Sequence, residues 1–204
     1  MSAAQQLTRE RILETALHLF STKGYLGATT KEISAESGVA EVTLFRHFPS
    51  KEILFEEMLA KYTFLPALRE IMPSIKKFPY EQALAEIAKK FLETLTLRKD
   101  LISILHSEVH TYPEKIRKIY HAFIQEIFST LAGYFDELQQ NGTLKPFDSL
   151  LGARAFLGMF FAYFISAHIF MFKKCRPNEM ESLIRGYVQF FVHGTIQEGS
   201  KHHG

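Results

Sequence analysis

The chain has 204 residues, of which 47% are hydrophobic and 23% charged, a balance typical of a folded globular protein and not of a disordered one. The single cysteine, Cys175, excludes an internal disulfide framework and a zinc site made of several cysteines, as suits a reducing cytosol. The formal net charge is only +2, and residues 1–60 carry six Lys and Arg against eight Asp and Glu, so any contact with a polyanion depends on a few well-placed cations.

The first predicted helix is amphipathic. Thr8 is its expected N-cap and Gly24 its expected end, and the residues between them place an apolar face at helical spacing. That face contains Ile12, Ala16, Leu19 and Phe20. The residues before Thr8 contain no apolar core of the kind that a secretion signal needs, so we expect a cytoplasmic protein.

A short second helix is predicted to begin after Thr29. Glu32 follows Thr29 at the spacing of a capping box, in which two otherwise unpaired backbone amides are satisfied. Ile33 and Ala35 are expected to form its apolar face, and Gly38 is expected to end it because glycine adopts the left-handed turn conformation easily.

A third helix is predicted over residues 40–47, with Leu44 and Phe48 directed into the core and Ser50 capping the helix that follows. Several residues of the third helix point outward: Glu41, Val42, Thr43, Arg46 and His47. Two short helices at a steep angle, the second presenting polar side chains, form the helix-turn-helix that fits the DNA major groove.

At these positions the chain resembles the TetR family of bacterial transcriptional repressors. Residues of the family pattern occur in order across the first quarter of the chain, and this makes the resemblance specific. They are Thr30, Ile33-Ser34, Ser37-Gly38-Val39, Thr43-Leu44-Phe45, His47-Phe48 and Ser50-Lys51-Glu52.

The resemblance implies two sets of DNA-binding residues. The residues expected at base edges are Lys31, Glu41 and Val42, and those expected at phosphates are Thr30, Thr43, Phe45, His47 and Lys51. Because Lys31 can donate to guanine and Glu41 can accept from the cytosine amino group, we expect a half-site that contains G·C pairs. The alternative is that Lys31, Arg46 and Lys51 are ordinary solvated charges.

Three positions depart from the family pattern. Phe45 replaces a usual tyrosine and loses a phenolic donor, and His47 also replaces a frequent tyrosine. Ala40 replaces a usual serine and so loses a helix cap worth ~1 kcal/mol. Arg46 is expected to make good the lost phosphate contact.

Helical patterns separated by Gly and Pro continue along the rest of the chain and predict an all-α protein of about nine helices. Beyond the helix-turn-helix, the expected helices span residues 51–72 (with a kink or break at Pro66), 81–97, 100–111, 112–140, 148–174 and 178–198. The predicted domains are a DNA-binding domain (7–52, motif 30–49, linker helix 51–72), a helical effector-binding and dimerisation domain (53–198), and a disordered tail (199–204).

Residues 155–172 form a run of eighteen residues without a formal charge, which reaches the lower length limit of a membrane span. Arg154 lies just before this run, Ser166 and His168 lie within it, and no second candidate span exists in the sequence. A core helix that packs inward on one face and on a partner with the other would have the same composition. We therefore expect no membrane insertion, and keep a membrane-associated helical adaptor as the less favoured alternative.

The resemblance implies a homodimer that pairs its last two helices and binds a palindromic double-stranded operator. The expected interface residues are Phe161, His168, Phe190 and Phe191. It also implies that the body binds a small apolar effector, in a pocket whose expected residues are Phe64, Phe91, Leu95, His106, His110, Tyr112, Phe123, Phe160 and Phe164. For any single aromatic residue, plain core packing is the competing explanation.

His106 and His110 are spaced so that both rings could share one face of a helix. The intervening Glu108 is not placed as in the HExxH motif of zinc proteases, so we predict no metal site and no cofactor. The sequence contains no glycine-rich phosphate loop and no nucleophile elbow, so we predict no enzyme. The expected function is ligand-responsive transcriptional repression, with activation by the same fold as the alternative.

Overall fold

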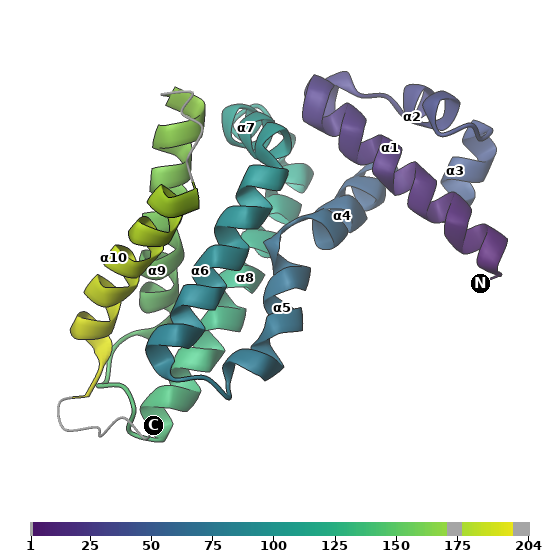
Figure 1. Ribbon diagram of the computed structural model, residues 1–204. Coiled ribbons are helices and arrows are strands. Elements are labelled where there is room, and N and C mark those ends of the chain that lie inside the picture. Colours follow the sequence, from purple (N-terminus) through teal and green to yellow (C-terminus); the bar gives the residue numbers. More distant parts are fainter. Residues whose placement is uncertain (1, 171–176, 198–204) are drawn as a thin grey trace. The chain divides into compact units, whose positions relative to one another are not determined.

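The computed structural model describes residues 2–170 and 177–197, and the regular elements of this part are helices (Figure 1). By their internal packing they form two compact units, one of residues 2–63 and 98–123 and the other of the remaining described residues, 64–97 and 124–197. An all-α fold, as predicted from the helical periodicity, is confirmed.

The first unit contains the helix-turn-helix. Its helices are α1 (Ala3–Gly27), α2 (Thr30–Glu36), α3 (Glu41–His47), α4 (Lys51–Tyr62), α7 (Lys99–Glu108) and the beginning of α8 (Glu114–Gln140). Helix α1 packs against α2, α4 and α7. An aromatic cluster holds them: the ring of Phe55 lies 5.4 Å from Phe20, 5.0 Å from Tyr25 and 6.3 Å from Tyr112, measured between centroids. Such edge-to-face contacts add to the area that the rings bury.

Helix α1 begins earlier than the sequence predicts. Ser2 and Gln5 form a capping box at its start, and Thr8 lies inside the helix, where its hydroxyl donates to the carbonyl of Ala4 at 2.9 Å. The prediction that Thr8 is the N-cap is therefore wrong, because Ser2, six residues upstream, caps the helix instead. Gly24, the expected end, has φ 72 and ψ 176 and interrupts the helical backbone there.

The capping box of α2 is confirmed, whereas its predicted apolar face is wrong at one position. The Thr29 amide donates to the Glu32 carboxylate at 3.0 Å, and the Glu32 amide donates back to the Thr29 hydroxyl at 3.2 Å. Ile33 is buried, but Ala35 is exposed and Ser34 is buried in its place. A serine can replace an apolar residue there because its hydroxyl donates to the carbonyl of Lys31 within the same turn.

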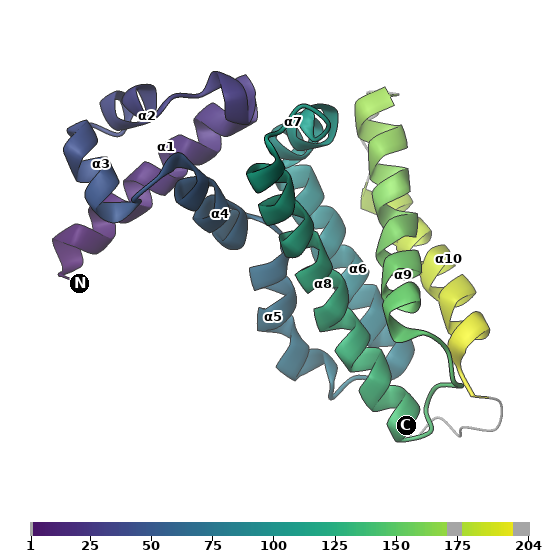
Figure 2. The same ribbon diagram turned by 180° about the vertical axis from the view of Figure 1, so that it is seen from behind.

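The second unit is a bundle of α5 (Phe64–Ile75), α6 (Tyr80–Leu97), the later part of α8, α9 (Ser149–Phe164) and α10 (Pro177–Thr195). Helix α9 continues as one turn of π-helix over Ile165–Phe170. Figure 2 shows α6, α9 and α10 side by side, and α6 packs against both of the others. The buried rings of Phe135, Phe156 and Phe160 form part of the core of this unit. The half-buried ring of Phe191 packs on those of Phe135 and Phe156.

The predicted helix 51–72 is divided at Thr63 into α4 and α5, and not at Pro66. Pro66 falls in the first turn of α5, where the backbone amide of a residue has no partner within the helix, so proline is tolerated. Pro73, expected in a connector, lies inside α5. The helix predicted to begin at residue 148 begins there: Asp148 is the N-cap of α9, and its carboxylate accepts from the amide of Leu151 at 2.9 Å.

Candidate nucleic-acid interface

The turn between α2 and α3 is built as the sequence predicts. Gly38 has φ 67, and the amide of Val39 donates to the carbonyl of Ser34 at 3.0 Å. Leu44 and Phe48 are fully buried and fix α3 to the unit, so its opposite face is presented to solvent. A short helix held in this way by two large apolar anchors is a rigid support for side chains that bind DNA.

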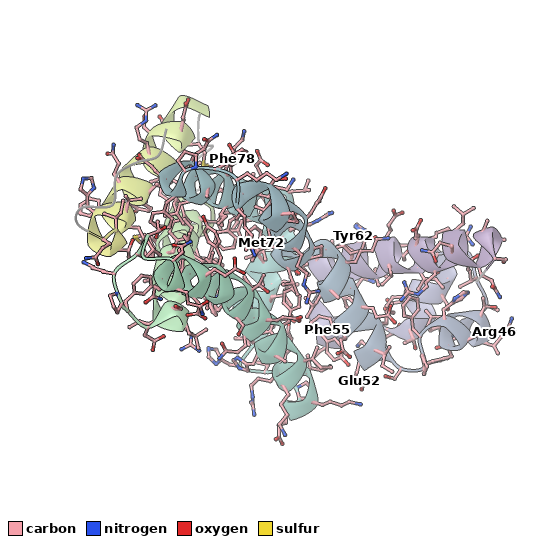
Figure 3. All side chains as sticks on the ribbon, turned by 90° about the horizontal axis from the view of Figure 1, so that it is seen from below. Arg46, Glu52, Phe55, Tyr62, Met72 and Phe78 are labelled. Atoms are coloured by element: carbon pink, nitrogen blue, oxygen red, sulfur yellow. The ribbon has the colours of Figure 1, made fainter. Side chains whose placement is uncertain are left out.

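The outward face of α3 is apolar at its centre and basic at its end. Val42 is 67% exposed and Phe45 is 41% exposed, although both are large hydrophobic residues. Arg46 is also exposed and lies at the periphery of the first unit (Figure 3). Exposed apolar residues at such a site can contact the methyl group of thymine in the major groove.

Ala40, the N-cap of α3, makes no side-chain hydrogen bond, as expected for a residue without a polar group. The first residue of α3, Glu41, is instead bound to the first residue of α2. The hydroxyl of Thr30 donates to Oε1 of Glu41 at 2.8 Å. The two short helices are thus joined by a side-chain hydrogen bond between a residue expected at phosphates, Thr30, and one expected at base edges, Glu41.

Lys51 lies at the start of α4, whose cap Ser50 accepts from the amide of Ile53 at 3.3 Å. Its ammonium group lies 4.3 Å from the centroid of the Tyr25 ring, and Glu52 is beside it. Burial lowers the pKa of Lys51 and raises the pKa of Tyr25 to about 12, so the cation faces a neutral phenol ring at physiological pH. Lys51 is therefore a positioned charge at a helix N-terminus, where anions are favoured.

Two ion pairs that the sequence pattern does not predict join helices of the first unit. Arg9 pairs with Glu57, and its guanidinium lies 5.0 Å from the centroid of the buried Phe48 ring. Lys23 pairs with Glu32 at 2.9 Å and links α1 to α2. Ion pairs between different helices have no fixed separation in the sequence, so the sequence alone does not reveal them.

The residues predicted for the effector pocket are divided between the units. Five of them lie buried in the second unit: Phe64, Phe91, Leu95, Phe160 and Phe164. The other four belong to the first unit: His106, His110, Tyr112 and Phe123. The rings of Phe64 and Phe91 are 4.8 Å apart. The prediction that His106 and His110 share a helical face is wrong, because α7 ends at Glu108 and His110 lies in the following turn.

The hollows found in the second unit lie elsewhere, between α6 and α10. One open groove of about 840 Å³ is lined by residues that include Leu92, Met180 and Ile184, and a smaller one of about 410 Å³ adjoins it. The nine predicted effector residues line neither groove. In the described part of the chain, no three His, Cys, Asp or Glu side chains are grouped as a metal site would require.

The predicted interface residues differ in exposure. Phe190 is 79% exposed, whereas Phe191 is half-buried, with its ring 5.6 Å from that of Phe135 and 5.1 Å from that of Phe156. Phe161 is half-buried, and the side chain of His168 lies outside the described residues. Ser149–Ala167 is long and apolar enough to cross a membrane, with a mean hydropathy of 1.6, but 39% of that window is buried inside the protein. The core helix of a soluble protein passes the same test of length and composition, so this feature alone is weak evidence of a span.

Taken together, a helix-turn-helix with an anchored, outward-facing second helix and a separate helical bundle define a DNA-binding transcriptional regulator. Residues 12–58 match the bacterial regulatory proteins of the tetR family, and residues 82–194 match the C-terminal domain of AefR-like transcriptional repressors. The chain belongs to the TetR family of transcriptional regulators, and it is not an enzyme.

Relatives agree with this assignment. The chain is 30% identical to the HTH-type transcriptional regulator YvkB of Bacillus subtilis over 158 residues, which cover 78% of this chain and 82% of YvkB. It is 26% identical to IcaR of Staphylococcus aureus, the negative transcriptional regulator of the biofilm operon icaADBC, over 70% of this chain and 77% of IcaR.

Solved structures share the fold. FadR of Bacillus subtilis in complex with stearoyl-CoA superposes with a TM-score of 0.71 at 21% identity, covering 91% of this chain and 98% of FadR. The flavonoid-responsive regulator FrrA superposes with a TM-score of 0.70 at 21% identity, covering 95% of this chain and all of FrrA (100%). At this identity the likeness establishes the arrangement of helices.

Proposed function

We propose that this protein is a cytoplasmic, ligand-responsive repressor that binds a palindromic operator as a homodimer and releases it when a small apolar effector binds. The observation that carries the proposal is α3, whose Leu44 and Phe48 are fully buried while Val42, Phe45 and Arg46 are exposed. Repression, and not activation, is favoured because the C-terminal residues match a repressor domain and IcaR is a negative regulator. The functional division of the chain into 7–52 and 53–198 is part of this proposal.

The DNA-binding role rests on a few positioned groups. Lys31 and Arg46 are exposed and form no ion pair with any described residue, so both can approach DNA without breaking a contact. Lys51 and the backbone amides at the start of α4 suit a phosphate. With so few cations in each head, the logarithm of affinity should fall with the logarithm of salt by about 0.9 per phosphate neutralised.

The proposed dimer is supported by the short length of α3, the helix proposed to contact base edges. One helix of seven residues reaches only a few base pairs, so useful specificity needs two heads in twofold symmetry. Phe190, exposed on α10, is the residue that most favours a second copy at this surface. Light scattering across a concentration series tests this; a monomer mass at every concentration would contradict it.

An apolar effector is favoured by the aromatic content of the second unit and by the relatives. FadR binds stearoyl-CoA and FrrA responds to flavonoids, and both ligand classes carry large apolar groups. An effector that binds better to the form unable to bind DNA shifts the dimer away from its operator by that difference in affinity alone. The buried rings around Phe64, Phe91 and Phe160 are the proposed binding region; because they line neither groove, an effector must separate packed side chains to enter it.

The experiment is a footprint of the purified protein on the DNA upstream of its own gene, in a salt series. Protection of a palindrome at nanomolar protein that weakens with salt is the expected result, and a long-chain acyl-CoA or a flavonoid is then added to test release. If the protein, stripped of bound ligand by refolding, protects no sequence there and enriches none from random DNA, the proposed function is wrong.

A further inference from the structure

The hydrogen bond between Thr30 and Glu41 connects two residues that open the two helices of the helix-turn-helix. Thr30 is the first residue of α2 and Glu41 the first residue of α3, eleven positions apart. The bond is 2.8 Å long and joins the Thr30 hydroxyl to one oxygen of the Glu41 carboxylate. Both side chains lie on the surface, Glu41 exposed and Thr30 half-buried.

This bond conflicts with a phosphate-binding role for Thr30. A hydroxyl group has one proton to donate, and a phosphate oxygen can only accept. Since the Thr30 proton is donated to Glu41, a phosphate contact would require this bond to break. Thr43 on α3 donates to no side chain in the described part of the chain, so the same objection does not apply there.

The bond leaves Glu41 able to accept further donors. A carboxylate has about four lone-pair sites on its two oxygens, and the Thr30 hydroxyl occupies one of them. Glu41 also lies in the first turn of α3, where the helix dipole favours negative charge. A second donor, such as the cytosine amino group, can therefore bind the same carboxylate while Thr30 holds it.

We propose that Thr30 is a positioning residue that fixes the Glu41 carboxylate for base recognition, and that it does not bind phosphate. A glutamate on the surface otherwise samples several rotamers, and ordering it on binding reduces the gain from a base contact. If Thr30 holds the Glu41 carboxylate in place before DNA binds, the contact discriminates more strongly between the right and the wrong base. This inference rests on the proposed function, because it requires that α3 reads DNA.

The test begins by locating the base pair that Glu41 reads. An operator is selected from random DNA with the wild-type protein, and Glu41→Gln is then measured on the operator and on its single-base variants. The base pair whose preference changes defines the position. A good base contact provides roughly five- to hundredfold discrimination there, so a loss of this size is measurable.

Thr30→Val, which removes the hydroxyl and keeps the shape, should reduce the preference at that same base pair by threefold or more. Binding to unrelated DNA should remain unchanged, and Thr30→Ser should restore the preference because it restores the donor. In the Glu41→Gln background, Thr30→Val should have no further effect on base preference. Thr43→Val serves as the matched control, with a uniform loss of affinity for all sequences.

Several outcomes would overturn the inference, and they differ from a failure of the proposed function. A uniform loss of affinity with Thr30→Val would make Thr30 a phosphate ligand, and an unchanged base profile would leave the bond without a role in recognition. A Glu41→Gln variant with wild-type base preference would remove the contact that Thr30 is said to position. If instead the wild-type protein enriches no sequence, the proposed function fails and the positioning role fails with it.

Discussion

Gly24 is the position at which a single methyl group should test the packing of the first unit. Its φ of 72 and ψ of 176 lie in a region that is essentially restricted to glycine. A Cβ atom there would lie 2.2 Å from both carboxylate oxygens of Glu108. Gly24→Ala therefore combines a backbone penalty with a clash between α1 and the end of α7.

The size of the effect follows from these two contributions. The backbone conformation costs about 1–3 kcal/mol for a residue with a Cβ atom. The Glu108 carboxylate is the end of a flexible side chain and can move, so the lower part of the range for overpacking, about 1 kcal/mol, is appropriate. Gly24→Ala should lower the free energy of unfolding by about 2–4 kcal/mol.

Gly38 provides the matched control. It has φ 67, but no atom lies within 4 Å of the position its Cβ would take. Gly38→Ala should therefore show only the backbone penalty, about 1–2 kcal/mol. Urea denaturation followed by circular dichroism at one fixed protein concentration measures both, because the stability of a dimer depends on concentration.

The steric contribution can be isolated with Glu108. In a double-mutant cycle, Glu108→Ala should relieve part of the cost of Gly24→Ala, with an interaction energy of about 1 kcal/mol. If Gly24→Ala destabilises the protein no more than Gly38→Ala does, or if the two sites are additive, then the carboxylate does not pack on Gly24 and the reasoning is refuted.

Three further predictions concern charge and assembly. The hydrogen bond from Lys23 and those from the N-cap threonine lower the pKa of Glu32 from 4.5 to about 2, so the stability they provide is present above pH 4.5 and is lost as the pH falls toward 2. Glu32→Gln should flatten that part of the pH–stability curve in urea titrations, and parallel curves would contradict it. Phe190→Glu should shift the protein toward monomers in sedimentation velocity, whereas Leu97→Glu, at a site 71% exposed, should leave the mass unchanged. Lys51→Met should reduce the salt slope of operator binding by about 0.9 for each protomer, and an unchanged slope would exclude a phosphate contact.

Features that depend on local spacing could be predicted from the sequence. Three such features are present: the capping box of Thr29 and Glu32, the turn at Gly38, and the buried pair Leu44 and Phe48. Each of them involves residues at most a few positions apart. Propensity and capping act over the same distance, so the sequence pattern contains the information.

Features that depend on competition between local choices, or on residues far apart in the chain, could not be predicted from the sequence. Thr8 satisfies the rule for a cap, but Ser2 satisfies it six residues earlier and the longer helix forms. The bond between Thr30 and Glu41 spans the turn, and the position of Lys51 on the Tyr25 ring depends on how α1 and α4 pack. No periodicity in the sequence specifies such pairs, so the geometry of the candidate site had to come from the structure.

The apolar helix α9 shows how composition alone leaves the environment of a segment open. A membrane span requires an apolar surface on all sides, yet Phe156 and Phe160 of α9 are fully buried inside the second unit. On its other side Arg154 donates to the side chain of Gln125 at 3.0 Å, and a charged residue of this kind is costly in lipid. Leu151, 64% exposed on the same helix, would be covered by a second protein surface at lower cost than by a bilayer. The physical balance therefore favours a partner chain over lipid at this helix, as the proposed homodimer would provide.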